Sequence, residues 1–302
     1  MKIFCTGASG YIGGSVAAKL VTAGHEVIGL SRSETADEMI RQIGATPLRG
    51  SLDDRDILQA AARDADMVVN SAHADHVGAA EALLEALEGS GKKFVHTSGS
   101  SLVGQRTQGK LSEEIFDEDT PVSPSPARVA RVALNKTILA SKERGVHPII
   151  VCPSLIYGLG LGADPHSMQV PWMIELARKF GVGKHIGAGE NIWSNVHMSD
   201  LVDLYLLAIE KAPAGGFYYA ENGEMSMKEL AENISRMLGF DGKAEAISMA
   251  DAEAEWGEGP ANDTMASNSR VRGVAGRALG WAPSAPSLME EIEKGCYVGF
   301  GK

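Results

Sequence analysis

Three glycines near the N-terminus have the spacing of a loop that binds a phosphate group. Gly7, Gly10 and Gly13 follow the β-like run 3–6 and precede a stretch with helical spacing, 14–23. In such a strand–loop–helix unit the first glycine permits a tight turn, the second lets backbone amides approach a diphosphate, and the third allows close helix–strand packing. The helix N-terminus adds positive potential. The pattern predicts a dinucleotide-binding loop, with a glycine-rich turn that binds nothing as the alternative.

The residues after the second predicted strand indicate which dinucleotide is bound. A carboxylate there would accept hydrogen bonds from the ribose hydroxyls and favour NAD, but Ser31 and Arg32 stand at this place. A guanidinium pairs with a phosphate through two hydrogen bonds, so Arg32 favours the 2′-phosphate of NADP. A solvated surface arginine is the alternative, and the nearby Glu34 leaves NAD open.

The elements that must position these residues alternate along the first half of the chain. Stretches with apolar residues at three- and four-residue intervals separate six β-rich runs, which are Ile3–Thr6, Glu26–Ser31, Thr46–Arg49, Met67–Asn70, Phe94–Thr97 and Pro148–Cys152. We therefore predict an α/β fold with a doubly wound parallel sheet of the Rossmann type in residues 1–153. Residues 154–302 are expected to form a smaller substrate-binding lobe, from which elements including 195–220 can return to the sheet. The long interruption 99–126 predicts a functional loop.

Composition and charge indicate which classes of binding partner to expect. The 302 residues carry a formal net charge of -11, which favours a small-molecule substrate over nucleic acid. No apolar run approaches the roughly 18 residues that cross a bilayer, and the first residues do not read as an export signal. The three cysteines are scattered and lack metal-ligand spacing, as expected of reduced thiols. We expect a cytoplasmic protein without a metal site or a membrane partner.

Several segments together resemble the extended short-chain dehydrogenase/reductase superfamily, and specifically its NAD(P)-dependent epimerase/dehydratase-like members. The matching segments are Thr6–Gly13, Gly50–Asp53, Asn70–His73, Pro153–Gly158, Asn195–Val202 and Leu279–Pro283. The resemblance implies NADP, or NAD, as the cofactor and a possible homodimer. The cofactor contacts that the loop, Arg32 and the resemblance together imply are Gly7, Ser9, Gly10, Tyr11, Ile12, Gly13, Arg32, Leu52, Ala72, Lys136, Pro153 and Ile156.

The catalytic residues of that superfamily transfer less well. Its members use a tyrosine as acid/base with a lysine four residues later, and here the lysine matches Lys136 while Val132 stands at the tyrosine position. Gly99 takes the usual serine position, with Ser98 and Ser100 beside it as candidate hydrogen-bond donors to substrate. The chain therefore looks like an atypical member.

Lys136 is the first candidate site residue, to hold the ribose hydroxyls, and a solvated helix lysine is the alternative. Tyr157 is a second candidate proton donor, with a packed aromatic side chain as the alternative. The leading hypothesis is an NADP(H)-dependent oxidoreductase acting on a small carbonyl or alcohol. A non-catalytic NADP(H)-binding redox sensor and an epimerase or dehydratase remain as alternatives.

Overall fold

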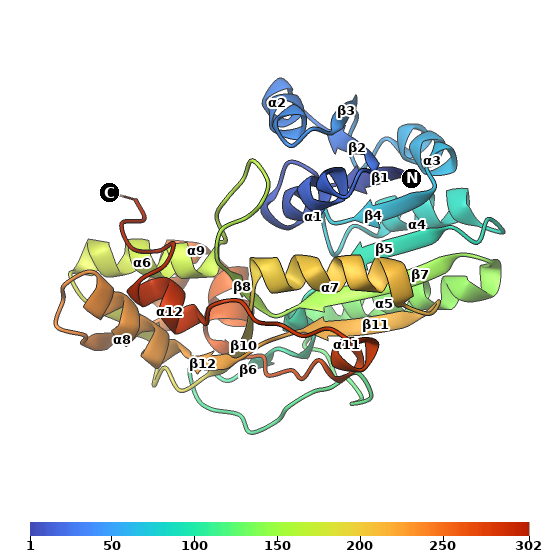
Figure 1. The fold of residues 1–302 in the computed structure, drawn as a ribbon. Helices are drawn as coiled ribbons and strands as arrows, with labels where there is room; N and C mark the ends of the chain where they lie inside the picture. The colour runs from blue at the N-terminus through green and yellow to red at the C-terminus, as the bar shows by residue number, and fades with distance from the viewer. Residues whose placement is uncertain (302) are drawn as a thin grey trace.

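Seven parallel strands form the central sheet of the computed structural model, which describes residues 1–301 (Figure 1). Their order is β11-β7-β5-β4-β1-β2-β3. The strands are β1 (Lys2–Thr6), β2 (Glu26–Ser31), β3 (Thr46–Arg49), β4 (Met67–Asn70), β5 (Lys93–Thr97), β7 (His147–Pro153) and β11 (Gly216–Ala220). The six predicted strands and the doubly wound fold are confirmed. The strand order reverses at β1, which pairs with β2 on one side and β4 on the other, so a crevice opens there at the carboxyl ends of the strands.

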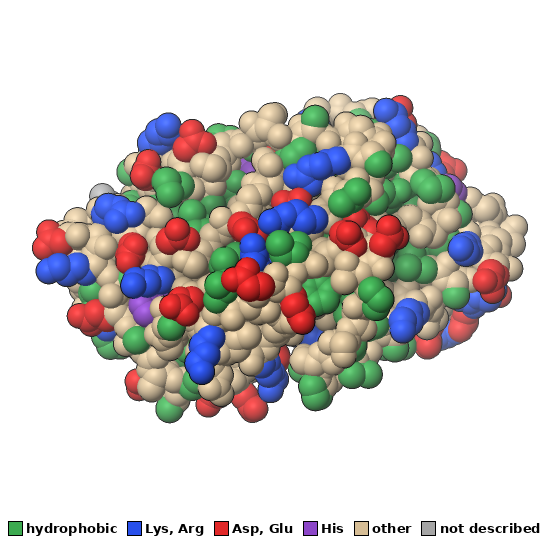
Figure 2. All heavy atoms as spheres, turned by 90° about the horizontal axis from the view of Figure 1, so that it is seen from below, with side chains coloured by type: hydrophobic (Ala, Val, Ile, Leu, Met, Phe, Trp, Pro, Cys, Tyr) green, Lys and Arg blue, Asp and Glu red, His purple; other side chains and the backbone are tan. Residues whose placement is uncertain are grey.

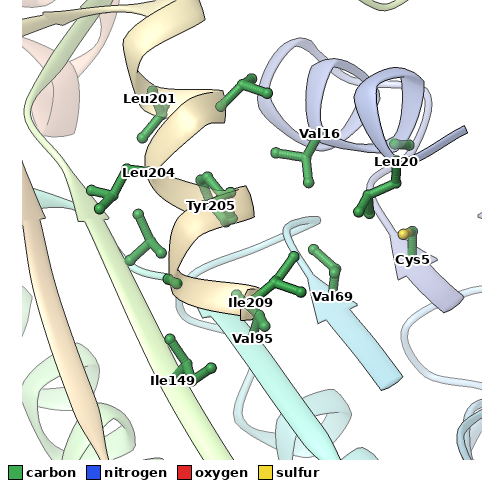
Figure 3. Close-up of a cluster of buried hydrophobic side chains, with 14 of the residues drawn as sticks. Cys5, Val16, Leu20, Val69, Val95, Ile149, Leu201, Leu204, Tyr205 and Ile209 are labelled. Atoms are coloured by element: carbon green, nitrogen blue, oxygen red, sulfur yellow. The ribbon is translucent and has the colours of Figure 1, made fainter. Parts of the chain in front are cut away.

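Helices cover both faces of this sheet. One face carries α1 (Tyr11–Thr22), α2 (Glu34–Gln42) and α7 (Met198–Lys211), and the other carries α3 (Arg55–Asp64), α4 (Val77–Leu87) and α5 (Val129–Ala140). Figure 3 shows α7 lying beside α1, with Leu201, Tyr205 and Ile209 among sheet residues such as Val95. Burial on both faces explains why the inner strands β1, β4, β5 and β7 read as largely apolar runs.

The second lobe has its own apolar core, built mainly from residues after β7. Its helices are α6 (Gln169–Phe180), α8 (Met227–Met237), α9 (Met249–Trp256), α10 (Glu258–Pro260) and α12 (Leu288–Glu293). Its short strands are β8 (Leu155–Tyr157), β9 (Gly183–Ile186), β10 (Ile192–His197), β12 (Glu224–Ser226) and β13 (Ala244–Ile247). These pair as β12-β10-β8 and β13-β9.

The chain passes from the sheet to this lobe and back again. After β10, α7 packs on the central sheet and β11 joins β7 in parallel as the outermost strand. The chain then leaves for β12 and α8, and α11 (Val274–Leu279) later returns to the neighbourhood of α7 and β11. The central sheet and its covering helices are therefore completed by residues that lie well beyond β7 in the sequence.

The long segment 99–126 runs beside the C-terminal part of the chain. It contains the 3-10 turn Ser100–Val103 and the short strand β6 (Gln105–Arg106), which pairs antiparallel with β14 (Ser267–Asn268). An isolated bridge joins Phe116 to Val271. The segment is thus attached to the second lobe and also starts next to the carboxyl end of β5.

The face of the molecule drawn in Figure 2 carries basic and acidic side chains interspersed with one another. Such mixing gives this face no extended field of one sign. Among residues 1–301, no helix is both long enough and apolar enough to cross a membrane.

Candidate functional site

A cavity of about 670 Å³ lies where the strand order reverses. It is lined by the loops that follow β1, β2, β4, β5 and β7, together with segment 164–169. It contains eleven of the predicted cofactor contacts, namely Gly7, Ser9, Gly10, Tyr11, Ile12, Gly13, Arg32, Leu52, Ala72, Pro153 and Ile156. Ser98 and Ser100 line it as well. The structure therefore brings together residues spread over about half of the chain.

The glycine loop is shaped by steric requirements at two of its positions. Gly7 has φ +75°, and a Cβ there would lie 2.8 Å from the backbone of Ala72. A Cβ on Gly13 would lie 2.4 Å from the carbonyl oxygen of Gly7. The N-cap of α1 is Gly10, whose position has no side-chain cap, and the first turn of α1 carries no acidic residue. Backbone amides at this N-terminus are therefore free to bind an anion.

Thr6 joins the ends of β1 and β4 beside this loop. Its Oγ1 lies 2.6 Å from Asn70 Oδ1 and accepts hydrogen bonds from the backbone N–H groups of Ser71 and Ala72 at 3.2 and 3.3 Å. Thr6 is fully buried, so these contacts are shielded from water. They hold the loop after β4 against the glycine loop, which fixes one wall of the cavity.

A segment of the second lobe is fastened to the start of α1. The Tyr11 hydroxyl donates to the carbonyl oxygen of Gly158 at 2.7 Å, and the backbone N–H of Leu161 donates to Ser15 Oγ at 2.9 Å. Burial raises the pKa of Tyr11, so its hydroxyl keeps its proton for this bond. The connection sets residues 164–169 over the cavity as its second wall.

At the β2 end of the cavity, Arg32 is exposed and forms no ion pair with any described residue. Ser33 lies next to it as the N-cap of α2, and its Oγ accepts from the backbone N–H of Ala36 at 3.2 Å. Ser31, at the end of β2, donates its hydroxyl to the carbonyl oxygen of Ser33 at 3.0 Å. No carboxylate lines this end of the cavity within the described part of the chain, where Leu30, Arg32, Ser33, Ala36 and Leu52 form the lining.

Ser98 and Ser100 lie at the other end, after β5. Ser98 is buried, and its Oγ accepts a hydrogen bond from Asn135 Nδ2 at 2.9 Å. Ser100 is buried too, and its Oγ lies 2.9 Å from Ser269 Oγ. Ser100 therefore connects the segment after β5 to the second lobe, whereas Ser98 connects it to α5.

Arg131 and Asn135 occupy the face of α5 that meets this end of the cavity, and neither residue was predicted from the sequence. Arg131 lines the cavity, and its Nε and Nη2 each donate to a carboxylate oxygen of Asp75 at 2.6 Å. Its Nη1 donates to Ser101 Oγ at 2.8 Å. Burial disfavours ionisation of Asp75, but the hydrogen bonds and charge of Arg131 hold the pKa of Asp75 below its ordinary value.

Lys136 does not reach the cavity, contrary to the role expected of it. It is exposed, whereas its neighbour Asn135 is buried against Ser98. One step along a helix turns a side chain by about 100°, so Lys136 points away from the surface that Asn135 shares with Leu134 and Ile138. The signal that would have located this face is the apolar stripe of α5, since Arg131 and Asn135 fall on the same stripe as the two buried residues.

Tyr157 also lies outside the cavity lining. Its side chain is fully buried, its hydroxyl donates to the carbonyl oxygen of Pro286 at 2.9 Å, and its ring packs edge-on against His197. Burial raises the pKa of this phenol, and the nearby Asp200 acts in the same direction. The geometry is that of a packed aromatic side chain that joins β8 to the C-terminal segment.

The residues present fit a dinucleotide. A Cβ at Gly7 or Gly13 would collide with backbone, so glycine keeps the loop tight. The N-terminal amides of α1 have no side-chain cap and lie where the strand order reverses. The cation Arg32 lies at the end of β2. Within residues 1–301, no group of three or more His, Cys, Asp or Glu side chains is placed to hold a metal ion.

Comparisons with known proteins agree with this geometry. Residues 3–219 match the model of the NAD dependent epimerase/dehydratase family. The chain is 32% identical to the oxidase ucsJ of Acremonium sp, covering 97% of this chain and 95% of that protein. It is 26% identical to the 2-alkyl-3-oxoalkanoate reductase of Stenotrophomonas maltophilia, covering 83% and 80%.

Among solved structures, the dTDP-glucose 4,6-dehydratase of Bacillus anthracis, in complex with NAD, superposes with a TM-score of 0.78 at 19% identity, covering 99% of this chain and 96% of that one. That structure shares the fold. The family match covers the central sheet from β1 into β11, and the expected resemblance is confirmed. The chain belongs to the NAD-dependent epimerase/dehydratase family.

Proposed function

We propose that the protein is an NADP(H)-dependent oxidoreductase that acts on a small carbonyl or alcohol substrate. The observation that carries the proposal is the single cavity that joins Arg32, the glycine loop and Ser98. A dinucleotide consists of an adenosine end, a diphosphate and a reacting nicotinamide end. Arg32, the glycine loop and Ser98 follow one another along the cavity in that order.

The adenosine end supports NADP over NAD. Arg32 has no carboxylate partner, so its guanidinium is available to a 2′-phosphate, and Ser33 places a hydroxyl and the start of α2 beside it. Among the described residues no carboxylate lines this end of the cavity; the first turn of α2 carries Glu34 and Asp37, and Asp37 is paired with Arg49.

The reacting end assigns roles to side chains on β5 and α5. Bound NADPH supplies a hydride to the carbonyl carbon of the substrate. Asn135 donates to Ser98 Oγ, so the hydroxyl proton of Ser98 remains available to a substrate oxygen. Arg131 supplies positive charge beside the same end of the cavity, which stabilises negative charge on that oxygen.

The names of two relatives support redox chemistry, in one case on a carbonyl compound. One is named as an oxidase and another as the reductase of a 2-alkyl-3-oxoalkanoate, which is a ketone. Reduction of a ketone needs one proton for the new hydroxyl, and water entering this partly open cavity can replace the proton that Ser98 donates.

The test is to measure NADPH and NADH binding by calorimetry, and their consumption at saturation with a panel of ketones and aldehydes. We expect NADPH to bind more tightly than NADH, and at least one carbonyl compound to be reduced. Arg32→Gln should lower NADPH affinity selectively, by about 10- to 100-fold for a lost charge-assisted phosphate contact.

Arg41→Gln is the matched control. Arg41 lies on α2 and is exposed, with its Nη2 3.8 Å from Asp37. It should leave the preference for NADPH unchanged. Equal losses of NADPH and NADH affinity in Arg32→Gln would remove the phosphate role, and saturable binding without turnover of any carbonyl would overturn the proposed activity.

A further inference from the structure

The guanidinium of Arg131 is held rigidly in the cavity wall without using all of its donors. Arginine has five N–H groups, and three of those on Arg131 donate hydrogen bonds, two to Asp75 and one to Ser101. The side chain is only 12% exposed, so the remaining N–H groups face a confined space. A planar guanidinium with a fixed orientation and two free N–H donors is suited to binding a second planar anion.

Arg128 adds a second positive charge near Arg131, although its side chain does not itself line the cavity. It precedes α5 by one residue and lies three residues before Arg131, a spacing that puts both side chains on one side of the helix. Its Nε is buried and lacks a hydrogen-bond partner, and so does the hydroxyl of Ser125 one turn earlier. Burial, together with the charge of Arg131, lowers the pKa of Arg128.

The carboxylates around these two arginines are already occupied. Asp75 is bound by Arg131, and Asp263 accepts from the Nε and Nη2 of Arg106 at 2.6 and 2.8 Å. The three arginines and two aspartates therefore leave one positive charge uncompensated. Burying such a charge is costly unless an anion joins it.

Of these arginines, Arg131 lines the cavity, at the end that follows β5. Asp164, the acidic residue among the lining residues, belongs to the segment fastened over Tyr11 and α1. Gly99 and Ser101 lie beside Arg131, and Thr264 and Trp193 also line the cavity. A Cβ on Gly99 would lie 3.2 Å from Arg131 Nη1, so the absence of a side chain at Gly99 gives the guanidinium the space that it occupies.

We propose that the substrate is an oxo acid whose carboxylate binds the free donors of Arg131, with the charge of Arg128 in support. This inference rests on the proposed function, because the carbonyl to be reduced lies on the same molecule. The carboxylate is a binding group and takes no part in bond making. A neutral ester of the same acid has the carbonyl but lacks the charge and the two equivalent oxygens.

The experiment uses the NADPH-loaded full chain and matched pairs of probes. The probes are straight-chain 2-, 4- and 5-oxo acids of six carbons, each paired with its methyl ester. Binding is measured by calorimetry and turnover by NADPH oxidation, so affinity is known even for a probe that is not reduced. The variants are Arg131→Lys, Arg128→Gln and, as control, Arg63→Gln on the exposed face of α3, whose Nη2 donates to Gln59.

In the wild type, at least one acid should bind about 10- to 100-fold more tightly than its ester, the range expected for a charge-assisted pair. Arg131→Lys should weaken binding of the acid far more than binding of the ester, and so abolish most of that preference. Arg128→Gln should reduce it several-fold. Because the Arg128 side chain forms no hydrogen bond, this variant is expected to fold even if Arg131→Lys does not. Arg63→Gln should behave as the wild type.

Equal affinity for every acid and its ester, or parallel losses for both in Arg128→Gln and Arg131→Lys, would overturn the inference. Acid-selective binding that depends on Arg131, without oxidation of NADPH by any probe, would support the carboxylate site and contradict the proposed reductase activity. If esters were reduced as fast as acids, the result would support the reductase activity and contradict the carboxylate site.

Discussion

Replacing Gly13 by alanine tests whether the tight start of α1 serves the cofactor. Gly13 is buried in the first turn of α1 with an ordinary helical backbone, so alanine alone would favour the helix by up to about 1 kcal/mol. Opposing this, the new Cβ would lie 2.4 Å from Gly7 O and 2.8 Å from Gly7 C, and both are backbone atoms. Ordinary contact begins near 3.4 Å, so the loop must open by about 1 Å.

Overpacking of this kind costs about 1 to 3 kcal/mol, which exceeds the gain in helix propensity. We therefore expect Gly13→Ala to lower the free energy of unfolding and to weaken NADPH binding, with about a 100-fold loss of turnover from the displaced loop. Urea denaturation and calorimetric titration with NADPH measure the two effects separately.

Gly78→Ala is the control, because Gly78 lies in α4 and a Cβ there would meet nothing closer than 3.9 Å. It should stabilise the protein by about 0.5 to 1 kcal/mol and leave NADPH binding unchanged. If Gly13→Ala matched Gly78→Ala in both stability and affinity, the steric reading of the loop would be refuted.

Three further predictions concern side chains away from the loop. Lys136→Ala should change the free energy of unfolding by less than about 0.5 kcal/mol and leave NADPH affinity unaltered, because the side chain is exposed outside the cavity; a tenfold weaker binding would return Lys136 to the site. Tyr157→Phe should lower stability by about 1 kcal/mol in a thermal melt, through loss of the bond to Pro286, while turnover persists; a loss of turnover without loss of stability would make the phenol catalytic. Burial lowers the pKa of His96 to about 4 from 6.5, so the unfolded chain takes up its proton first, and stability present above pH 6.5 is lost by up to about 3 kcal/mol as the pH falls toward 4. His96→Gln should show a shallower decline in urea denaturation over that range, and an unchanged slope would contradict the assignment.

The sequence predicted the central sheet well because its signals are local. Each buried strand is a short, largely apolar run, and the glycine loop is encoded by the steric needs of consecutive residues. The six strands β1 to β5 and β7 could therefore be located without knowing their neighbours. The last strand, β11, was harder to place, since nothing within Gly216–Ala220 says that it pairs with β7. Pairing between distant segments depends on the path of the whole chain.

The reacting end of the site was less predictable for the same reason. Alignment to a tyrosine–lysine pair selected Lys136, whereas the buried stripe of α5 places Arg131 and Asn135 toward the cavity. The partner of Arg131, Asp75, lies on the loop after β4, and no local pattern links the two residues. The apolar residues Leu134 and Ile138 indicate which face of α5 is buried, so that face could have been predicted from the sequence. The ion pair between Arg131 and Asp75 could be seen only in the structure.

The return of the chain to the central sheet has a consequence for dissecting the molecule. A fragment ending at residue 153 would lack both the strand that flanks β7 and the long helix whose Leu201, Tyr205 and Ile209 are wholly or largely shielded by the sheet and α1. Its bare apolar face and newly created edge would invite self-association in place of nucleotide capture. Although the second lobe has an apolar core of its own, the molecule is not two separable modules. Genetic cuts that seek a minimal nucleotide binder must keep the chain through Ala220.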